Sequence, residues 1–290
     1  MNVDPLFQNL LISSPNGGGL FAVRCGEVIH VDGKSSTGID LRGDCLLRAM
    51  QPSGWIYYGS TPETTLMAPI AVPDIHDALL VDDGFLVVCT EGNEVVRYGR
   101  DFAMERQWRF GGAPDSMHVN CLANWNGRIV FSAFGAFATH HGYKAGTMGT
   151  GFVRDLETGE TLIAGLSQPH NPTPLDDGLL LADSERLSLV LYDGSGAKIR
   201  EANLDGYTRG VAVNERTIFV GLSCSRNIEG DAEGSACVVA LDRHSWKAVA
   251  RISIPAREIY DIRIAADART LDAVLEKIAR TVPRKLRAHA

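Results

Sequence analysis

Short apolar runs bounded by Gly, Asp and Asn recur along nearly the whole chain, as in GWIYYGS, GFLVVCT, GRIVFSAFG, GLLLADS and TIFVGLS. Each run follows a shorter segment that ends in small or apolar residues. Each also precedes another apolar run, such as NEVVRYG, LSLVLYD or ACVVALD. Runs of this length with turn residues on both sides predict β-strands. Their recurrence predicts a four-stranded unit repeated at the period of a β-propeller.

The start of the first strand in each unit makes the period explicit. The anchors are spaced by 39, 42, 52, 39 and 51 residues, at Thr37, His76, His118, His170, Arg209 and Tyr260. Both long spacings contain an extra loop between the second and third strands, at 135–151 and 223–236. The repeat therefore predicts six blades, two of which carry an insertion.

The two ends of the repeat complement each other. The segment REIYDIRIA supplies a first strand with no blade after it, and LLISS, GLFAVR and EVIHVDG supply three strands without a first. We expect the C-terminal strand to join the three N-terminal strands, because closure removes free sheet edges. The prediction is an all-β, six-bladed propeller over residues 1–266, followed by a C-terminal helix and basic tail over 267–290.

The helix is predicted over 268–282 from the spacing of Leu271, Val274, Leu275 and Ile278. Pro283 ends it. The basic residues of the tail beyond are interpreted as a solvated end.

Composition limits the classes of partner. The net charge is −7 and the pI is near 5.6, which argues against nucleic acid or an anionic membrane surface as a partner. No run of 18 apolar residues and no secretory signal are present, so we expect a cytoplasmic protein that does not enter a membrane. The six cysteines form no CxxC pair and are interpreted as reduced thiols. The sequence predicts no oligomeric state.

The polar anchors should meet at one mouth of the channel. Innermost strands line the channel of a propeller, and their starts open on the same face as the loops between second and third strands. Polar groups in a narrow channel must be paired with each other, with water or with a ligand. The predicted set is His76 and Asp77, His118 and Asn120, His170 and Asn171, Arg209, and Tyr260 and Asp261.

Three functions fit this set. Neutral imidazoles at His76, His118 and His170 would bind one divalent metal, such as Zn, Mn or Fe, and leave a position open for water or substrate. Without a metal, a histidine oriented by Asp77 or Asp261 would transfer protons, with Tyr260 as proton donor.

The third function is recognition without chemistry, in which Arg209 binds a carboxylate or phosphate. As catalytic residues we predict His118, His170, Tyr260 and Asp261. As substrate-binding residues we predict Asn120, Asn171, Arg209 and Asp77. The first insertion carries His140 and His141, which fit either a lid over the mouth or an exposed loop.

Five segments resemble, in order, the signatures of a bacterial family of propeller-like proteins of uncharacterised function: MHVNCLA, LSQPHNPTP, GYTRGVAV, IFVGLSCSR and REIYDIR. The resemblance covers about residues 70–265. It implies the propeller fold and equivalent family positions for His118, Asn120, His170, Arg209 and Asp261, with His76 and Asp77 as the family's His-Asp pair. The chain departs from the family at Asn171 and Thr173, where Ser and Arg are usual.

We therefore expect an enzyme that acts on a small polar or anionic metabolite, of the lyase, isomerase or lactone-type hydrolase class. The alternative is a non-catalytic propeller that binds an anionic metabolite or sugar, or a protein-interaction scaffold.

Overall fold

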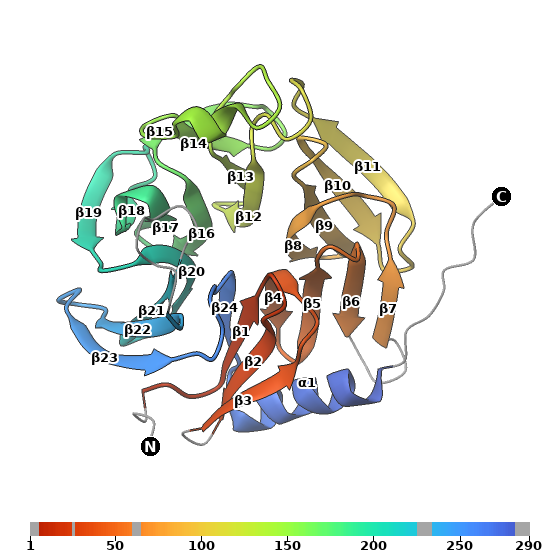
Figure 1. Ribbon diagram of the computed structural model, residues 1–290, viewed down its shortest axis with the longest axis vertical. Helices are drawn as coiled ribbons and strands as arrows, with labels where there is room; N and C mark the ends of the chain where they lie inside the picture. The colour runs from red at the N-terminus through yellow and green to blue at the C-terminus, as the bar shows by residue number, and fades with distance from the viewer. Residues whose placement is uncertain (1–5, 25–26, 60–64, 225–233, 282–290) are drawn as a thin grey trace.

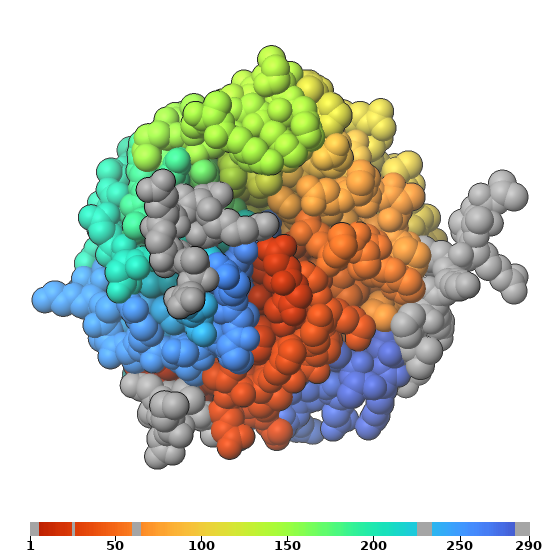
Figure 2. All heavy atoms as spheres, viewed as in Figure 1, coloured from red at the N-terminus to blue at the C-terminus, as the bar shows by residue number. Residues whose placement is uncertain are grey.

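A computed structural model describes residues 6–24, 27–59, 65–224 and 234–281. Its strands form six four-stranded antiparallel sheets that stand as blades around a central axis (Figure 1). The predicted fold class, a six-bladed β-propeller with a short C-terminal helix, is confirmed. Consecutive parts of the chain occupy consecutive sectors of the ring (Figure 2).

Each blade begins at the axis with its inner strand and ends at the rim with its outer strand. From axis to rim, blade 1 contains β24 (Asp261–Ile264), β1 (Leu10–Ser14), β2 (Gly19–Arg24) and β3 (Glu27–Asp32). Blade 2 contains β4 (Ser36–Arg42), β5 (Cys45–Met50), β6 (Trp55–Gly59) and β7 (Thr65–Pro69). Blade 3 contains β8 (Ile75–Val81), β9 (Gly84–Cys89), β10 (Glu94–Gly99) and β11 (Met104–Arg109).

The other three blades follow the same order. Blade 4 contains β12 (Val119–Trp125), β13 (Arg128–Ala133), β14 (Gly151–Asp155) and β15 (Thr161–Leu166). Blade 5 contains β16 (Pro169–Leu175), β17 (Gly178–Asp183), β18 (Ser188–Tyr192) and β19 (Lys198–Asn203). Blade 6 contains β20 (Tyr207–Val213), β21 (Thr217–Ser223), β22 (Cys237–Asp242) and β23 (Ala248–Ser253).

Apolar layers between neighbouring blades explain why the second strands are continuous apolar runs. Successive side chains of a strand point to opposite faces of its sheet. On β17, Leu179 and Leu181 pack toward blade 4, whereas Leu180 and Ala182 pack toward blade 6. A middle strand of a blade is therefore buried on both faces, and its sequence shows no apolar–polar alternation.

The C-terminal helix covers the joint between blades 1 and 2 (Figures 1 and 2). The helix, α1 (Ala268–Arg280), begins where the Asp267 side chain accepts a hydrogen bond from the Thr270 N–H. Its buried Leu271 and Val274 pack with Leu11 and Leu46. No helix among the described residues is long and apolar enough to cross a bilayer.

The innermost strands form a closed ring, because each packs on the next from β4 round to β24 and back to β4. The pairing register shifts near the start of β4, β8, β12, β16 and β20, which is the signature of a β-bulge. Bulges re-aim side chains and are common beside binding sites. In this propeller they lie at the predicted anchors, for example between Ile75 and Asp77 in β8.

Hydrogen bonds of inner-strand side chains join neighbouring blades in series from blade 1 to blade 6. Asn120 Nδ2 donates to the Pro169 carbonyl over 2.8 Å, and Asn171 Oδ1 accepts from the Gly210 N–H over 2.7 Å. The equivalent contacts elsewhere are Thr37 Oγ1 to Ile75 O, Leu122 N to Asp77 Oδ2, and Ile39 N to Asp261 Oδ2. We call these contacts the inter-blade hydrogen bonds.

Replacing Asn171 by Ala should lower the free energy of unfolding by about 2–4 kcal/mol. The change strands the buried Gly210 N–H and places alanine at a φ of 47°, a left-handed conformation that Asn tolerates better. Chemical denaturation would measure the loss. Asn203→Ala, at an exposed position of β19, is the matched control and should change little. Equal losses in the two variants would contradict a structural role for the Asn171 contact.

Candidate functional site

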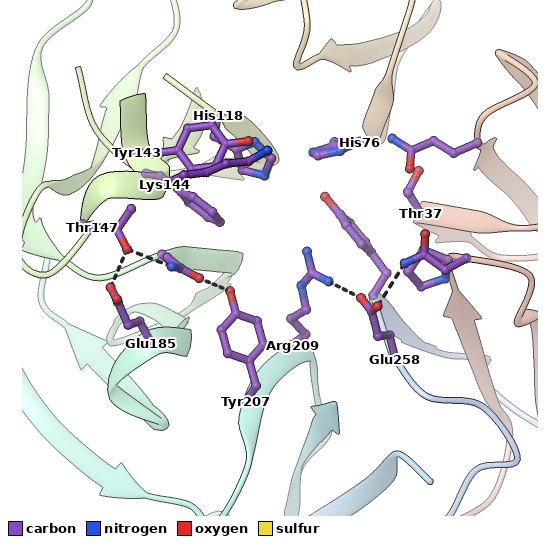
Figure 3. Close-up of a pocket in the computed structure, with 17 residues that line it drawn as sticks. Thr37, His76, His118, Tyr143, Lys144, Thr147, Glu185, Tyr207, Arg209 and Glu258 are labelled. Atoms are coloured by element: carbon purple, nitrogen blue, oxygen red, sulfur yellow. Dashed lines mark hydrogen bonds and ion pairs between the residues drawn. The ribbon is translucent and has the colours of Figure 1, made fainter. Parts of the chain in front are cut away.

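A cavity of about 710 Å³ opens at one mouth of the central channel (Figure 3). The starts of the inner strands supply part of its lining, and the loops between second and third strands of the blades supply much of the rest. Among the predicted anchors, the cavity is lined by Thr37, His76, His118, Arg209 and Tyr260. These five anchors therefore meet at one mouth of the channel, as the sequence predicts.

His118 is held by a carboxylate that the sequence analysis did not single out. Its Nδ1 lies 3.0 Å from Asp115 Oδ1. A carboxylate only accepts hydrogen bonds, so Nδ1 carries the proton and Nε2 has the free lone pair. Burial lowers the pKa of His118 to about 4, although the Asp115 hydrogen bond opposes the shift. At neutral pH His118 is therefore an uncharged imidazole.

Asp115 is a shared acceptor for three side chains. Besides His118, it faces His141 Nε2 over 2.9 Å and accepts from the Tyr143 hydroxyl over 2.7 Å. Although burial raises its pKa, the hydrogen bonds that it accepts from His118 and Tyr143 hold the pKa of Asp115 below its usual value. The carboxylate is thus ionised and fixes the orientation of His118.

His76 lies beside His118 and belongs to the neighbouring blade. The two rings meet edge to face, with 4.9 Å between their centroids. His76 Nε2 is 3.5 Å from Asp74 Oδ1, so this histidine also has a carboxylate of its own. Its Nδ1 is buried and has no hydrogen-bond partner among the described residues.

Arg209 enters the cavity from β20, where Figure 3 shows its ion pair with Glu258, and His170 is its second partner. Its Nε and Nη2 donate to His170 Nε2 over 3.3 and 3.2 Å, and its Nη1 donates to Glu258 Oε2 over 3.1 Å. The guanidinium lies over the ring of Tyr260, 4.9 Å from its centroid. An arginine suits this buried position better than a lysine, because its planar guanidinium is less strongly hydrated and can stack on an aromatic ring.

His170 is a support for Arg209 and is fully buried. Its Nδ1 is 2.9 Å from the Gln168 carbonyl, so that nitrogen carries the proton and Nε2 accepts from Arg209. Burial and the Arg209 charge hold the pKa of His170 well below its usual value. Both ring nitrogens are in use within the protein, and a catalytic role for His170 stays a prediction.

Tyr260 forms part of the cavity lining, but its hydroxyl has a partner. The hydroxyl donates to the Asn120 carbonyl over 3.2 Å. Burial raises the pKa of Tyr260 well above its usual value, so its proton is hard to remove. The role of Tyr260 as proton donor stays a prediction, and its ring is part of the cavity wall.

The predicted residues Asp77, Asn120, Asn171 and Asp261 do not line the cavity. All four are buried and make the inter-blade hydrogen bonds. Burial raises the pKa of Asp261 to about 6, and burial with the charge of Asp261 raises the pKa of Asp77. Sequence reasoning placed them at the mouth because each follows a mouth residue by one or two positions.

The three histidines do not form a shared ligand set. The lone pair of His170 Nε2 faces the Arg209 guanidinium, where a metal cation would be repelled. Within the described residues, no three His, Cys, Asp or Glu side chains are grouped so as to hold a metal ion. A divalent metal stays a prediction from the sequence, and this arrangement offers it no three-histidine site.

The first insertion lies at the cavity. It contains a 3₁₀ helix, η1 (Gly142–Ala145), and contributes Tyr143, Lys144 and Thr147 to the lining. The contacts of His141 and Tyr143 with Asp115 attach it to the site. Most of the second insertion, 225–233, lies outside the described residues.

Asp74, Asp115 and Glu258 are the functional residues that sequence reasoning missed. A signal for two of them was present, because Asp74 and Asp115 precede the histidines of their blades by two and three residues. Such an acid, in the turn before a strand that starts with histidine, lies within reach of the imidazole. Glu258 precedes the last inner strand and carries no comparable signal.

The fold and cavity define a six-bladed propeller with a polar site at one mouth of its channel. Residues 70–274 match a family described as a domain of unknown function (DUF4915), and the chain belongs to that family. No curated protein matches the sequence. The predicted resemblance to an uncharacterised family of propellers is confirmed.

Solved structures show the same fold at low identity. A protein of unknown function from Bacteroides caccae is 14% identical over 89% of this chain and 98% of its own, with a TM-score of 0.65. A chain of a nidogen/laminin complex is 11% identical over 88% and 97%, with a TM-score of 0.62. A luciferin-regenerating enzyme is 11% identical over 78% of both chains, with a TM-score of 0.57. The fold therefore serves both enzymes and assembly proteins.

Acidification should destabilise the protein through His118. The unfolded chain binds a proton at this imidazole near pH 6.5, whereas the folded protein resists it down to about pH 4. The stability supplied by the neutral ring is complete above about pH 6.5 and is lost as the pH falls toward 4. Unfolding free energies at pH 7.5 and 5.5 should therefore differ more for the wild type than for His118→Asn.

Asn is the chosen replacement because it tolerates the φ of 50° found at position 118. A titration of the imidazole resonances by NMR gives the pKa directly. A midpoint for His118 at its ordinary value of about 6.5 or higher would contradict the burial argument.

Proposed function

We propose that the protein is an enzyme that removes a proton from a small metabolite carrying an anionic group. One observation carries the proposal. A neutral histidine fixed by its own carboxylate, His118 with Asp115, lines the same cavity as a fixed guanidinium, Arg209. Such a cavity holds a base and an anion-binding group together.

His118 is the proposed general base. The Asp115 carboxylate keeps the proton on Nδ1, so Nε2 is the atom that accepts a proton from substrate. Asp115 then stabilises the imidazolium that forms, because its negative charge is already in place. The ring of Phe134 packs on His118 with 4.3 Å between centroids, which limits water on that side.

Arg209 is the proposed anion-binding residue. A guanidinium has five N–H groups in a planar fork. Contacts with His170 and Glu258 use one N–H on each nitrogen and leave one on Nη1 and one on Nη2 for a ligand. Because the Arg209 side chain is already held in place, it would lose little conformational entropy when a ligand carboxylate binds to it. Both groups line one cavity of about 710 Å³, so one small molecule would reach both.

The volume of the cavity agrees with a metabolite-sized ligand, since such sites usually measure about 300–1,000 Å³. The binding-only alternative shares the Arg209 contact and lacks a use for the His118–Asp115 pair.

Arg209→Gln should weaken binding of a small sugar acid such as gluconate by about 10- to 100-fold, the loss expected for a charge-assisted hydrogen bond. Isothermal titration would measure the affinity, with the uncharged polyol sorbitol as the comparison ligand. The matched control is Arg106→Gln. Arg106 also pairs with a glutamate, Glu157, but it lies on the outer strand β11, away from the cavity. Unchanged gluconate affinity in a folded Arg209→Gln variant would contradict the anion-binding role.

His118→Asn should leave ligand affinity within a few-fold and slow proton removal by about 100-fold or more. The readout is exchange of the C2 proton of bound hydroxy acids with deuterium, followed by NMR in D₂O. A wild-type protein that binds such acids and exchanges no carbon-bound proton would be a binding protein, and the proposal would fail.

A further inference from the structure

We propose that the first insertion completes the general base, with Tyr143 as the positioning residue that holds His118 and Asp115 in their working orientation. This inference rests on the proposed function and adds a residue and a loop to the same site. Tyr143 acts through the His118–Asp115 pair and has no proton transfer of its own.

Tyr143 contacts both members of the pair. Its hydroxyl donates to Asp115 Oδ2 over 2.7 Å, and its ring lies against the His118 ring with 4.6 Å between centroids. Figure 3 shows Tyr143 beside His118 at the cavity, which both residues line. Phe134 packs on the His118 ring as well. The imidazole is therefore held at Nδ1 by the carboxylate and at its ring by two aromatic side chains.

The contacts of the Asp115 carboxylate fix its orientation. The side chain is buried, and both of its oxygens are in use. Oδ1 faces His118 Nδ1, whereas Oδ2 faces the Tyr143 hydroxyl and His141 Nε2. Two of these three groups belong to the insertion. Since a buried acceptor without a partner costs free energy, loss of the insertion contacts would favour rotation of the carboxylate away from His118.

The insertion does not depend on the Tyr143 hydroxyl to stay in place. Other hydrogen bonds attach it to the body of the propeller: from the His141 N–H to the Asp115 carbonyl, between His140 Nδ1 and the Pro114 carbonyl, from Thr147 Oγ1 to Glu185, and from the Gly149 N–H to Ser167 Oγ. The hydroxyl ends instead on the carboxylate behind the base. Its contact therefore points to a role in the site.

The hydroxyl should also leave a mark on the titration of His118. Burial lowers the pKa of His118 to about 4, and the Asp115 hydrogen bond opposes the shift. Each hydrogen bond that a carboxylate accepts stabilises its charge and weakens its hold on other donors. Removing the Tyr143 hydroxyl should therefore strengthen the effect of Asp115 and raise the pKa of His118.

The other titratable or charged groups around His118 belong to the blades and to the insertion. They are His76 and Asp74 at blade 3, His141 on the insertion, His170 on blade 5 and Arg209 on blade 6. Tyr143→Phe keeps all of these groups and the aromatic ring. A change in the titration of His118 is then due to the one hydroxyl.

The test follows Tyr143→Phe by two measurements. In NMR of the full chain without ligand, we expect the titration midpoint of His118 to rise by about 0.5–1 pH unit above that of the wild type. Deuterium exchange at C2 of bound gluconate should slow by about ten-fold, because small misplacements of a catalytic group are costly. The stronger base offsets only about two- to three-fold of the loss in orientation.

Tyr192→Phe is the matched control, because it removes a tyrosine hydroxyl from β18, away from the cavity. It should change neither the His118 midpoint nor the exchange rate. His141→Asn removes the other insertion side chain at Asp115 Oδ2, and Asn tolerates the φ of 55° found there. It should shift the midpoint in the same direction as Tyr143→Phe, so the test survives if that variant fails to fold.

A hydroxyl with a merely structural role would lower stability and leave the titration of His118 unchanged. An unchanged midpoint or an unchanged exchange rate in folded Tyr143→Phe would overturn this inference and leave the proposed function standing. A wild type that exchanges no carbon-bound proton would overturn the proposed function. The His118 midpoint, measured without ligand, would then still decide whether Tyr143 acts on the His118–Asp115 pair.

Discussion

The structure depends on how polar groups are paired around the axis of the propeller. Six inner strands converge there, and the channel excludes most of the water that would otherwise solvate their side chains. The protein resolves this by giving Thr37, Asp77, Asn120, Asn171 and Asp261 a backbone partner on the next blade. These contacts fix the rotation of each blade against its neighbour. The apolar layers between blades stabilise the packing of the blades, whereas the inter-blade hydrogen bonds set how neighbouring blades are aligned.

The site follows from the same arrangement. A bulge near the start of an inner strand turns one polar side chain inward to the next blade and leaves its neighbour at the mouth. In β8 the inward residue is Asp77 and the mouth residue is His76. The inter-blade hydrogen bonds hold the inner strands beside the mouth residues, and the segments before β8, β12 and β24 bring the carboxylates Asp74, Asp115 and Glu258 to them. Chemistry at the mouth is thus supported by residues that never touch the cavity.

Much of the fold could be predicted from the sequence because strand-length apolar runs and turn residues repeat with a regular period. The location of the cavity could be predicted for the same reason. The roles of neighbouring polar residues could not, since Asp77 and His76 are adjacent in sequence and a local bulge decides which one faces the ligand. His170 and Arg209 were assigned separate roles from residue type alone. Their mutual hydrogen bonds, which make one the support of the other, join residues 39 positions apart.

The pairing of β24 with β1 sets an order of events during synthesis. β1 leaves the ribosome before the other strands of the ring, and its partner β24 leaves after them. Throughout that interval the edge of β1 is an open template for other strands, which is a route to aggregation. Tyr260 and Glu258 arrive with β24, so the cavity wall and the closed ring are completed together. A nascent chain therefore has no complete cavity before β24 is made, and a chaperone that shields β1 would protect the fold and the cavity in one step.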